Sequence, residues 1–314
     1  MIQYDQQYLD ALIDGLHGVF GSYPGHRAVQ AKEGGGCIGM FTATPEAARI
    51  SRAAHFAGIP IPATIRFSVG SGNPFVSDKS VDDHGMAVKF HLPDGATTDI
   101  VARMVAAAQA STPEGFLAFF HAVAPDPATG QPNPAAVEAL IKEHPDVQRF
   151  LELNAALKPI ASYAQAIYSA SHTFRFINAE GVTTLGRYRW LPEAGVATLT
   201  QAELQARDDN YLSDELRARL ERGPVVFQLQ LQLAEPGDDI NDSTKDWPDT
   251  RRAVALGRLE ITSLIESRPD LAESMVFDPT NFTDGIDASD DPVLAIRKAV
   301  YERAYARRMA AAQA

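Results

Sequence analysis

Strictly alternating apolar and polar positions mark the clearest strand of this chain. Segment 225–233 reads VVFQLQLQL, with Phe227, Leu229, Leu231 and Leu233 on one face and glutamines on the other. Because successive side chains of a strand point to opposite sides, we expect the first face to lie in the core. The neutral polar face favours a barrel wall, or contact with a second element, over open solvent.

Apolar runs with β-branched residues, separated by Gly, Pro or Asp, predict further strands. These runs span 63–70, 85–92, 97–105, 172–178, 183–191 and 253–264. The first three follow one another closely and predict an antiparallel meander. Residues 179–181 predict a hairpin turn between the next two strands.

Helical spacing and capping signals predict helices at 1–20, 44–56 with Thr44 as N-cap, 113–121, 133–157 and 291–308. Between the first two, Gly34–Gly36 predicts irregular backbone or a close approach to something bulky, and its spacing does not fit a dinucleotide-binding motif. Strands joined by hairpin-length links, with helices apart from them, predict an α+β fold with a mainly antiparallel barrel or sheet.

Composition narrows the class of protein and its partners. The chain has 314 residues, 45% of them hydrophobic, and its net charge of -12 argues against nucleic acid or an anionic membrane as a partner. The first 20 residues have no basic start, so we expect a helix there and not a signal peptide, and no run is apolar and long enough to span a bilayer. The single cysteine, Cys37, excludes an intrachain disulfide and fits a reducing compartment, so we expect a cytoplasmic protein.

The predicted helix at 291–308 carries candidate chemistry. Arg297 and Tyr301 are four residues apart and share a face, where a guanidinium favours the ionised form of a phenol. A phenolate is an iron ligand, and tyrosine is one of the proximal ligands that hold haem iron in proteins. Arg308, two turns further on, can meet a carboxylate such as a haem propionate. For this pattern alone, the alternative is an exposed, charge-rich terminal helix.

Motifs along the whole chain join these signals. In order and spacing, RAVQAK, TIRFSVG, GMAVKF, SHTFRFINAEG, STKDWP, LGRLEI, FDPTNF and RKAVYERAYARR resemble the haem catalase family from about Pro24 to Arg308. The chain length is similar to that of the small catalase-related peroxidases. The resemblance implies a catalase-like antiparallel β-barrel with surrounding helices, formed by residues 1–314 as a single domain, and a haem b cofactor with its iron.

Carried over residue by residue, the resemblance implies that Tyr301 binds the iron and that Arg297 stabilises the charge on its oxygen. His172 and Asp291 match the residues that continue this network away from the iron. A carboxylate that holds an imidazole, which in turn faces the guanidinium, is a chemically sensible extension of the pair.

The resemblance also implies contacts with the rest of the haem. Arg27, Arg66 and Arg308 match the three arginines that bind the propionates, while Val29 matches the aliphatic residue over the ring and Phe116 the aromatic residue that stacks on it. Without this context, three scattered arginines in an acidic protein would be interpreted as surface residues.

The distal side departs from the family pattern. Gln30 stands where the family has its catalytic histidine, and a glutamine exchanges hydrogen bonds but takes up no proton near neutral pH. Ser68 matches the residue that supports that histidine. Arg103, with Met104 beside it, stands in the place of the catalytic asparagine, and its charge is a candidate for stabilising a departing oxygen anion.

The segment 105–111, VAAAQAS, replaces a bulky apolar and aromatic run of the family. The lost volume predicts an enlarged space near the distal face of the haem, with an apolar surface at 106–108, that admits something larger than hydrogen peroxide. The alternative is that side chains from elsewhere in the chain fill this space.

These observations predict an enzyme, a haem peroxidase that uses organic hydroperoxides or hydrogen peroxide and an electron donor, with weak or no catalase activity because of Gln30. Two alternatives stay open. One is a haem isomerase or dehydratase of lipid hydroperoxides, similar to the allene oxide synthases, although those keep the distal histidine. The other is a haem-binding protein without turnover. A homo-oligomer is compatible with the sequence.

Overall fold

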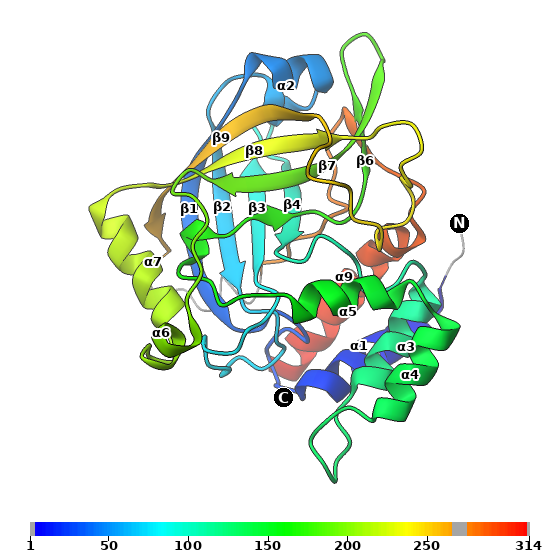
Figure 1. Cartoon of the computed structure of the whole chain (residues 1–314). Coiled ribbons are helices and arrows are strands. Elements are labelled where there is room, and N and C mark those ends of the chain that lie inside the picture. The colour runs from blue at the N-terminus through cyan, green and yellow to red at the C-terminus, as the bar shows by residue number, and fades with distance from the viewer. Residues whose placement is uncertain (1–3, 266–274, 313–314) are drawn as a thin grey trace.

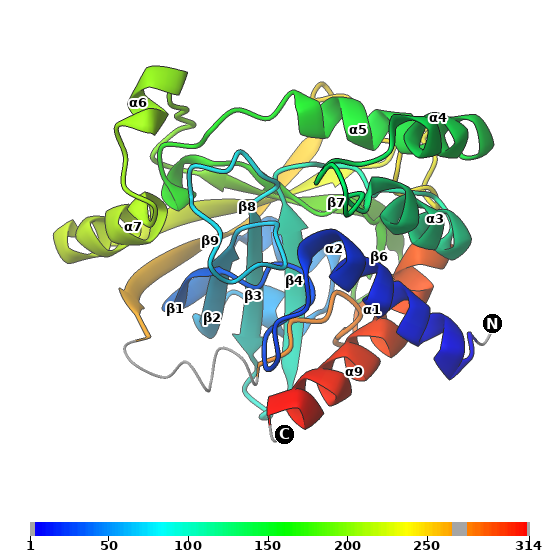
Figure 2. The ribbon, with the colours of Figure 1, turned by 90° about the horizontal axis from the view of Figure 1, so that it is seen from below.

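A curled antiparallel sheet is the centre of the computed structural model, which describes residues 4–265 and 275–312 (Figures 1 and 2). The strand order is β10-β6-β7-β5-β4-β3-β2-β1-β9-β8, and β7 also pairs with β8, which closes the sheet into a barrel. The strands are β1 (Glu33–Ala43), β2 (Ile61–Ser68), β3 (Gly85–His91), β4 (Thr97–Arg103), β5 (Tyr168–Ser169), β6 (Phe174–Ile177), β7 (Thr183–Pro192), β8 (Val225–Leu233), β9 (Ala253–Leu264) and β10 (Ile286–Ala288). The predicted α+β class with an antiparallel barrel is confirmed.

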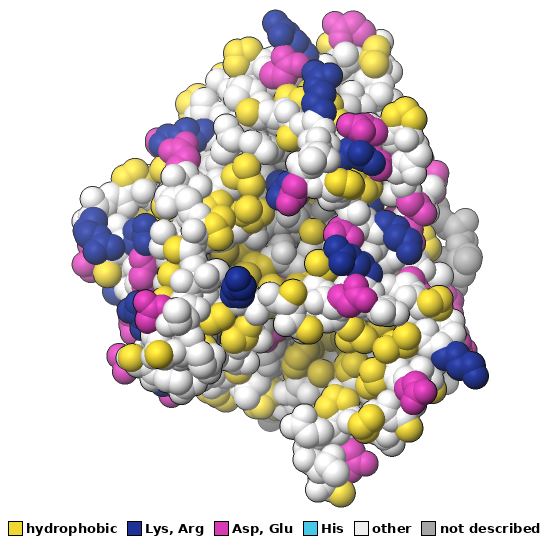
Figure 3. Space-filling model, viewed as in Figure 1, with side chains coloured by type: hydrophobic (Ala, Val, Ile, Leu, Met, Phe, Trp, Pro, Cys, Tyr) yellow, Lys and Arg dark blue, Asp and Glu magenta, His cyan; other side chains and the backbone are white. Residues whose placement is uncertain are grey.

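Helices surround the barrel. They are α1 (Gln6–Phe20), α2 (Pro45–Ile50), α3 (Pro113–Val123), α4 (Pro134–Glu143), α5 (Val147–Ala155), α6 (Gln201–Gln205), α7 (Tyr211–Arg222) and α9 (Pro292–Ala312), with 3-10 helices η1 (Ala54–Phe56) and η2 (Tyr163–Gln165). Helices α1, α3, α4, α5 and α9 gather beside one part of the barrel and are called the helical layer below (Figures 1 and 2). Hydrophobic side chains gather over part of this layer on the face shown in Figure 3. None of the helices in the described ranges is long and apolar enough to cross a membrane.

The alternating pattern of β8 is confirmed. Phe227, Leu229 and Leu231 are fully buried in the barrel core beside Trp190, the largest side chain there. On the polar face, Gln232 is also buried and donates to the Pro248 carbonyl at 2.8 Å, so this face contacts a second segment of the chain.

The predicted meander is confirmed, and its register positions one edge of the site. Strands β2, β3 and β4 pair in sequence, with Ser68 opposite Gly85 and Gly85 opposite Arg103. The end of β2, the start of β3 and the end of β4 therefore lie side by side. The hairpin of β6 and β7 also forms where it was predicted, with Ile177 opposite Thr183.

The structure differs from the predicted elements in two places. The glycine run at 34–36 lies in strand β1, which the sequence did not predict and which pairs with both β2 and β9. The expected irregularity is present as a register shift against β2 between Glu33 and Gly35. Small residues let these strands approach closely: a Cβ on Gly39 would lie 2.6 Å from the Glu260 carbonyl oxygen. The helical block at 133–157 is interrupted before Pro145 and forms α4 and α5, since proline cannot continue a helix.

Helix α9 forms as predicted and runs four residues beyond Arg308. Asp291 caps the start of this helix, because its carboxylate accepts hydrogen bonds from the backbone N–H groups of Val293 at 2.8 Å and Leu294 at 3.3 Å. On its other side α9 packs against α1, where Arg303 binds Asp10 through two hydrogen bonds of 2.8 Å.

Candidate active site

A cavity of about 560 Å³ lies between the barrel and the helical layer, within the size range of cofactor sites. Side chains of α1, α3, α5 and α9, of segment 22–30 and of strand ends line it. Its wall is largely apolar, with Leu12, Phe116, Phe150 and Val300 among the contributors. Most of the predicted site residues meet here: Arg27, Val29, Gln30, Arg66, Arg103, Phe116, Arg297, Tyr301 and Arg308.

Helix α9 places Arg297 and Tyr301 together at the cavity wall. Their i, i+4 spacing brings the Nη2 of Arg297 to 2.6 Å from the Oη of Tyr301, to which it donates a hydrogen bond. The guanidinium carbon lies 5.1 Å from the centre of the tyrosine ring. A cation this close stabilises negative charge on the phenol oxygen.

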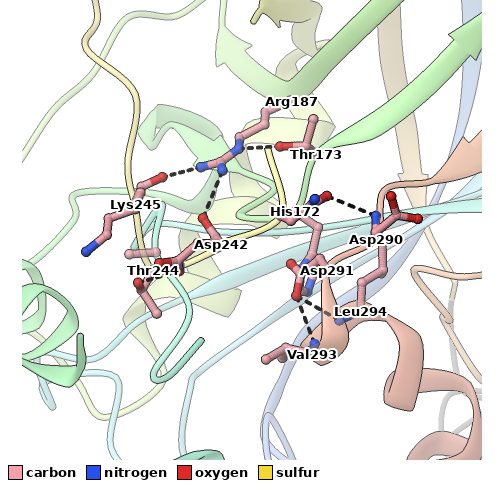
Figure 4. Close-up of polar contacts among 12 residues, drawn as sticks. His172, Thr173, Arg187, Asp242, Thr244, Lys245, Asp290, Asp291, Val293 and Leu294 are labelled. Carbon is pink, nitrogen blue, oxygen red and sulfur yellow. Dashed lines mark hydrogen bonds and ion pairs between the residues drawn. The ribbon is translucent and has the colours of Figure 1, made fainter. Parts of the chain in front are cut away.

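His172 and Asp291 lie outside the cavity lining, and Figure 4 shows them with Val293 and Leu294 at the start of α9. The Nδ1 of His172 is 2.7 Å from Asp291 Oδ2, and both side chains are buried. Burial lowers the pKa of His172 despite the opposing hydrogen bond with Asp291, and the charge of nearby Arg297 lowers it further. Burial opposes the ionisation of Asp291, but the hydrogen bonds from His172, Ser243 and Val293 leave its pKa below the usual value.

A neutral imidazole that donates from Nδ1 presents Nε2 as an acceptor. His172 Nε2 and Arg297 Nε are both buried, and neither has a hydrogen-bond partner among the described residues. Hydrogen bonds thus join the carboxylate to the imidazole and the guanidinium to the phenol at the cavity, and the charge of Arg297 acts on the imidazole.

Three guanidinium groups add positive charge to the cavity. Arg27 donates to the Met275 carbonyl at 2.8 Å, Arg66 lies 5.5 Å from the centre of the Phe277 ring, and the buried Arg308 lies 5.2 Å from that of Tyr305. They come from the segment before β1, from β2 and from α9. Arginines at a mainly apolar cavity suit a flat apolar ligand that carries carboxylates.

Val29 and Phe116 are the apolar residues predicted to contact the ring. Val29 is 38% exposed although it is aliphatic, because it borders the cavity. Phe116 extends from α3 and packs edge-on against Phe120, with ring centres 5.0 Å apart. Both therefore present apolar surface to the cavity.

Gln30 is held in an unusual backbone conformation, with φ of +53°. Its carbonyl oxygen accepts from Arg66 Nη1 at 3.0 Å. A Cβ on Gly85 would lie 2.5 Å from Gln30 Nε2 and 3.0 Å from Ser68 Oγ, so both side chains lie over this glycine. Ser68 is buried beneath Gln30 and does not itself line the cavity.

Arg103 borders the cavity, but its charge is already engaged. Its Nη1 lies 3.0 Å from Asp83 Oδ2, and its Nη2 donates to the Ala107 carbonyl at 2.8 Å. The guanidinium carbon is 5.8 Å from the centre of the Phe150 ring. Arg103 is therefore paired with a buried carboxylate, and its role in stabilising an oxygen anion stays a prediction.

The expected apolar surface at 106–108 is wrong. Ala107 and Ala108 are buried, and Ala107 packs in a cluster with Phe119 of α3 and Phe150 of α5. Among residues 106–109, only Gln109 lines the cavity. Side chains from the helical layer fill the volume that the small residues leave, which is the alternative considered above.

Sequence reasoning missed two contributors to the site. Asp82 and Asp83 line the cavity next to Gln30 and Gly70, and their only signal was an acidic pair directly before the strand at 85–92. A helix at 1–20 was predicted, but not that Leu16 and His17 of α1 would line the cavity.

The geometry fits a haem. A tyrosine oxygen beside a guanidinium is a suitable donor for iron, the three arginines suit two propionates, and the apolar walls suit a porphyrin face. When bound, haem would supply a redox-active iron that polarises and cleaves the O–O bond of a peroxide.

The barrel with its helical layer is the fold of the catalases. The structure matches a fungal catalase with a TM-score of 0.82 at 20% identity, and a bacterial catalase with a TM-score of 0.81 at 22% identity, each over 92% of this chain. The chain spans 60% and 58% of the lengths of those two catalase chains.

Residues 24–314 match the Catalase family, and the chain belongs to this family. It is 41% identical over 293 residues to the Catalase-related peroxidase of Mycolicibacterium paratuberculosis, covering 93% of this chain and 92% of that protein. It is 34% identical over 300 residues to the Catalase-related peroxidase of Synechococcus elongatus, covering 95% and 88%. Family membership implies a haem cofactor.

Proposed function

We propose that this protein is a haem b peroxidase that reduces organic hydroperoxides or hydrogen peroxide with electrons from a donor and has weak or no catalase activity. The observation that carries the proposal is the Arg297–Tyr301 hydrogen bond of 2.6 Å at a cavity that also holds Arg27, Arg66 and Arg308. Two relatives named Catalase-related peroxidase, which match nearly the whole chain, support the same activity.

In this proposal Tyr301 binds the iron, and Arg297 stabilises the negative charge on its oxygen. His172, held by Asp291, keeps the guanidinium oriented. Arg27, Arg66 and Arg308 hold the propionates, while Val29 and Phe116 contact the ring. Each of these roles uses a side chain that lies at the cavity or directly behind it.

Gln30 sets the limit on hydrogen peroxide chemistry in this proposal. Its amide orients a peroxide by hydrogen bonding but carries no proton between two oxygen atoms. Catalase turnover needs such transfers on a small substrate that binding alone orients poorly. A larger hydroperoxide gains orientation from the apolar walls, so we expect it to be the better substrate.

Stopped-flow absorbance of the haem-loaded protein tests the function. The protein is mixed separately with hydrogen peroxide and with cumene hydroperoxide, with and without a reducing co-substrate such as an aminobenzene dye. The proposal expects a spectral change with the hydroperoxide and oxidation of the dye at a matched rate. Hydroperoxide loss without the dye would point to an isomerase instead, and an unchanged spectrum to a haem-binding protein without turnover.

A further inference from the structure

Among the described residues that line the cavity, Asp82 and Asp83 supply the only carboxylates. They lie on the side of Gln30, because both contact Gly70: the Gln30 backbone N–H donates to the Gly70 carbonyl at 3.4 Å, and a Cβ on Gly70 would lie 2.6 Å from Asp82 Oδ1 and 2.8 Å from the Asp83 carbonyl oxygen. Gln30 cannot transfer a proton, and the part of the cavity around it therefore has two carboxylates nearby.

The register of the barrel strands fixes the position of Asp83. With Gly85 opposite Arg103, residue 83 lies beside the first residues after β4. Asp83 Oδ1 accepts from the Val105 backbone N–H at 2.8 Å, and its Oδ2 lies 3.0 Å from Arg103 Nη1. Oδ2 is buried against Arg103, and this ion pair holds the carboxylate in place. A carboxylate oxygen has two lone pairs, so Oδ1, which accepts from Val105, retains the capacity to accept a proton.

Asp82 is placed differently. Its Oδ1 accepts from the Asp83 backbone N–H at 2.7 Å, and a Cβ on Gly70 would lie 2.6 Å from that oxygen. Asp82 is only partly buried, whereas Asp83 is 6% exposed. Asp83 is thus the carboxylate that the backbone, Arg103 and the cavity wall hold in one position.

We propose that Asp83 carries out the proton transfers that Gln30 cannot perform. The carboxylate takes the proton of a hydroperoxide ROOH as its O–H bond breaks. It returns this proton to the oxygen that departs with the O–O bonding pair, so the product leaves as neutral ROH and Asp83 is a carboxylate again. In the overall reaction, ROOH takes two electrons from the donor and two protons and gives ROH and water, and this net reduction belongs to the proposed peroxidase function, on which this inference rests.

Electrostatics suit this role. Burial raises the pKa of Asp83 to about 6, with a smaller upward effect of the Asp82 charge, while Arg103 and the N–H groups of Val105 and Met104 act in the opposite direction. A carboxyl that gains and loses its proton near neutral pH is a better acid–base group than an ordinary aspartate. Arg103 then acts as a positioning residue for Asp83.

The test compares Asp83→Asn with Asp82→Asn. A positioned proton-transfer group is worth about a hundredfold to ten-thousandfold in rate. We expect the second-order rate constant with cumene hydroperoxide to fall at least about thirtyfold in Asp83→Asn and to lose its inflection near pH 6. Asp82→Asn should keep the inflection and move it to lower pH, because a neighbouring negative charge has been removed.

A readout independent of turnover is the carboxyl titration of the same proteins labelled with ¹³C-aspartate. The parent should show one carboxyl carbon that titrates near pH 6, and only Asp83→Asn should lack it. If Asp83→Asn leaves Arg103 unpaired and fails to fold, the double variant with Arg103→Gln removes both members of the buried pair.

An Asp83→Asn protein with the parent's rate and pH profile would overturn the role of Asp83 alone. Equal losses in both aspartate variants would also overturn the assignment to Asp83. A parent that reacts with no hydroperoxide at any pH would instead refute the proposed peroxidase, and the proton-transfer role with it.

Discussion

At the scale of single residues, we predict from the resemblance that Gln30 stands in the place of a histidine, and the two side chains differ in their ability to transfer a proton. The glutamine occupies a left-handed backbone position over Gly85, against Ser68 and Arg66. Histidine tolerates this backbone region better than most residues. The site can therefore accept an imidazole without a change of the backbone.

Gln30→His should accelerate the reaction with hydrogen peroxide by at least about tenfold, because a distal base contributes a hundredfold or more when its partners are in place. The matched control is Gln30→Leu, which removes the amide without adding a base and should not accelerate the reaction. Larger hydroperoxides should gain less, since the apolar walls already orient them. Second-order rate constants from stopped-flow mixing measure both effects, and equal rates in parent and histidine variant would refute this view of Gln30.

The difference between local and distant partners explains which residues the sequence could predict. Arg297 and Tyr301 could be paired from their spacing on one helix, and the structure confirms the contact. Asp83 and Arg103 could not be paired, because their contact depends on the register of β3 against β4. The resemblance to the catalases brought out the arginines of the cavity but not its carboxylates, Asp82 and Asp83.

At the scale of elements, strand β1 shows how glycine serves close packing. Periodicity reveals strands with alternating apolar and polar side chains, and a glycine-rich strand lacks that signal. In β1 the glycines instead permit contacts with β2 and β9: a Cβ on Gly39 would lie 2.6 Å from the Glu260 carbonyl oxygen and 3.1 Å from Ile65 Cδ1. The barrel wall that carries the Gln30 segment depends on this approach.

Gly39→Ala should lower the free energy of unfolding by about 1–3 kcal/mol, the usual cost of overpacking. The control is Gly36→Ala in the same strand, where the nearest atom, Ile265 Cδ1, would lie 3.4 Å from the new Cβ and the contact is ordinary. Urea unfolding of the two variants gives the comparison. Equal stability of Gly39→Ala and Gly36→Ala would contradict the account of β1.

At the scale of the whole molecule, buried histidines link stability to pH. His55 is 1% exposed among Phe41, Phe56 and Phe90, and neither ring nitrogen has a hydrogen-bond partner within the described ranges. Burial lowers its pKa from 6.5 to about 3. The folded state therefore binds a proton at His55 less readily than the unfolded chain does. The contribution of His55 to the free energy of unfolding is fully present above about pH 6.5 and is lost as pH falls toward 3.

Between pH 6.5 and pH 5, the fall in the free energy of unfolding should be about 1.5 kcal/mol smaller in His55→Phe than in the parent, as linkage predicts for one group of this kind. The control is His121→Gln, which changes an exposed histidine of α3. Urea unfolding at the two pH values checks the result. A pH dependence in His55→Phe that equals the parent's would show that His55 does not contribute to it.

The whole-molecule architecture was the most predictable level. The meander, the hairpin and the terminal helix follow from local patterns, and their assembly into a catalase fold follows from motifs spread over the chain. The sides of the cavity were not predictable in this way, because α1, α3 and α5 reach it only through tertiary packing. A single domain, a cytoplasmic location and a homo-oligomer stay predictions from the sequence.

The absorption spectrum of haem b bound to Tyr301→Phe tests the central claim, that this helix holds the haem through Tyr301. The matched control is Tyr305→Phe, which removes a phenol from the same cavity wall one turn further along α9. After desalting, the parent and Tyr305→Phe should retain haem with the same ferric spectrum, and Tyr301→Phe should lose the haem or change that spectrum. Retention of haem with the parent's spectrum by Tyr301→Phe would contradict the account.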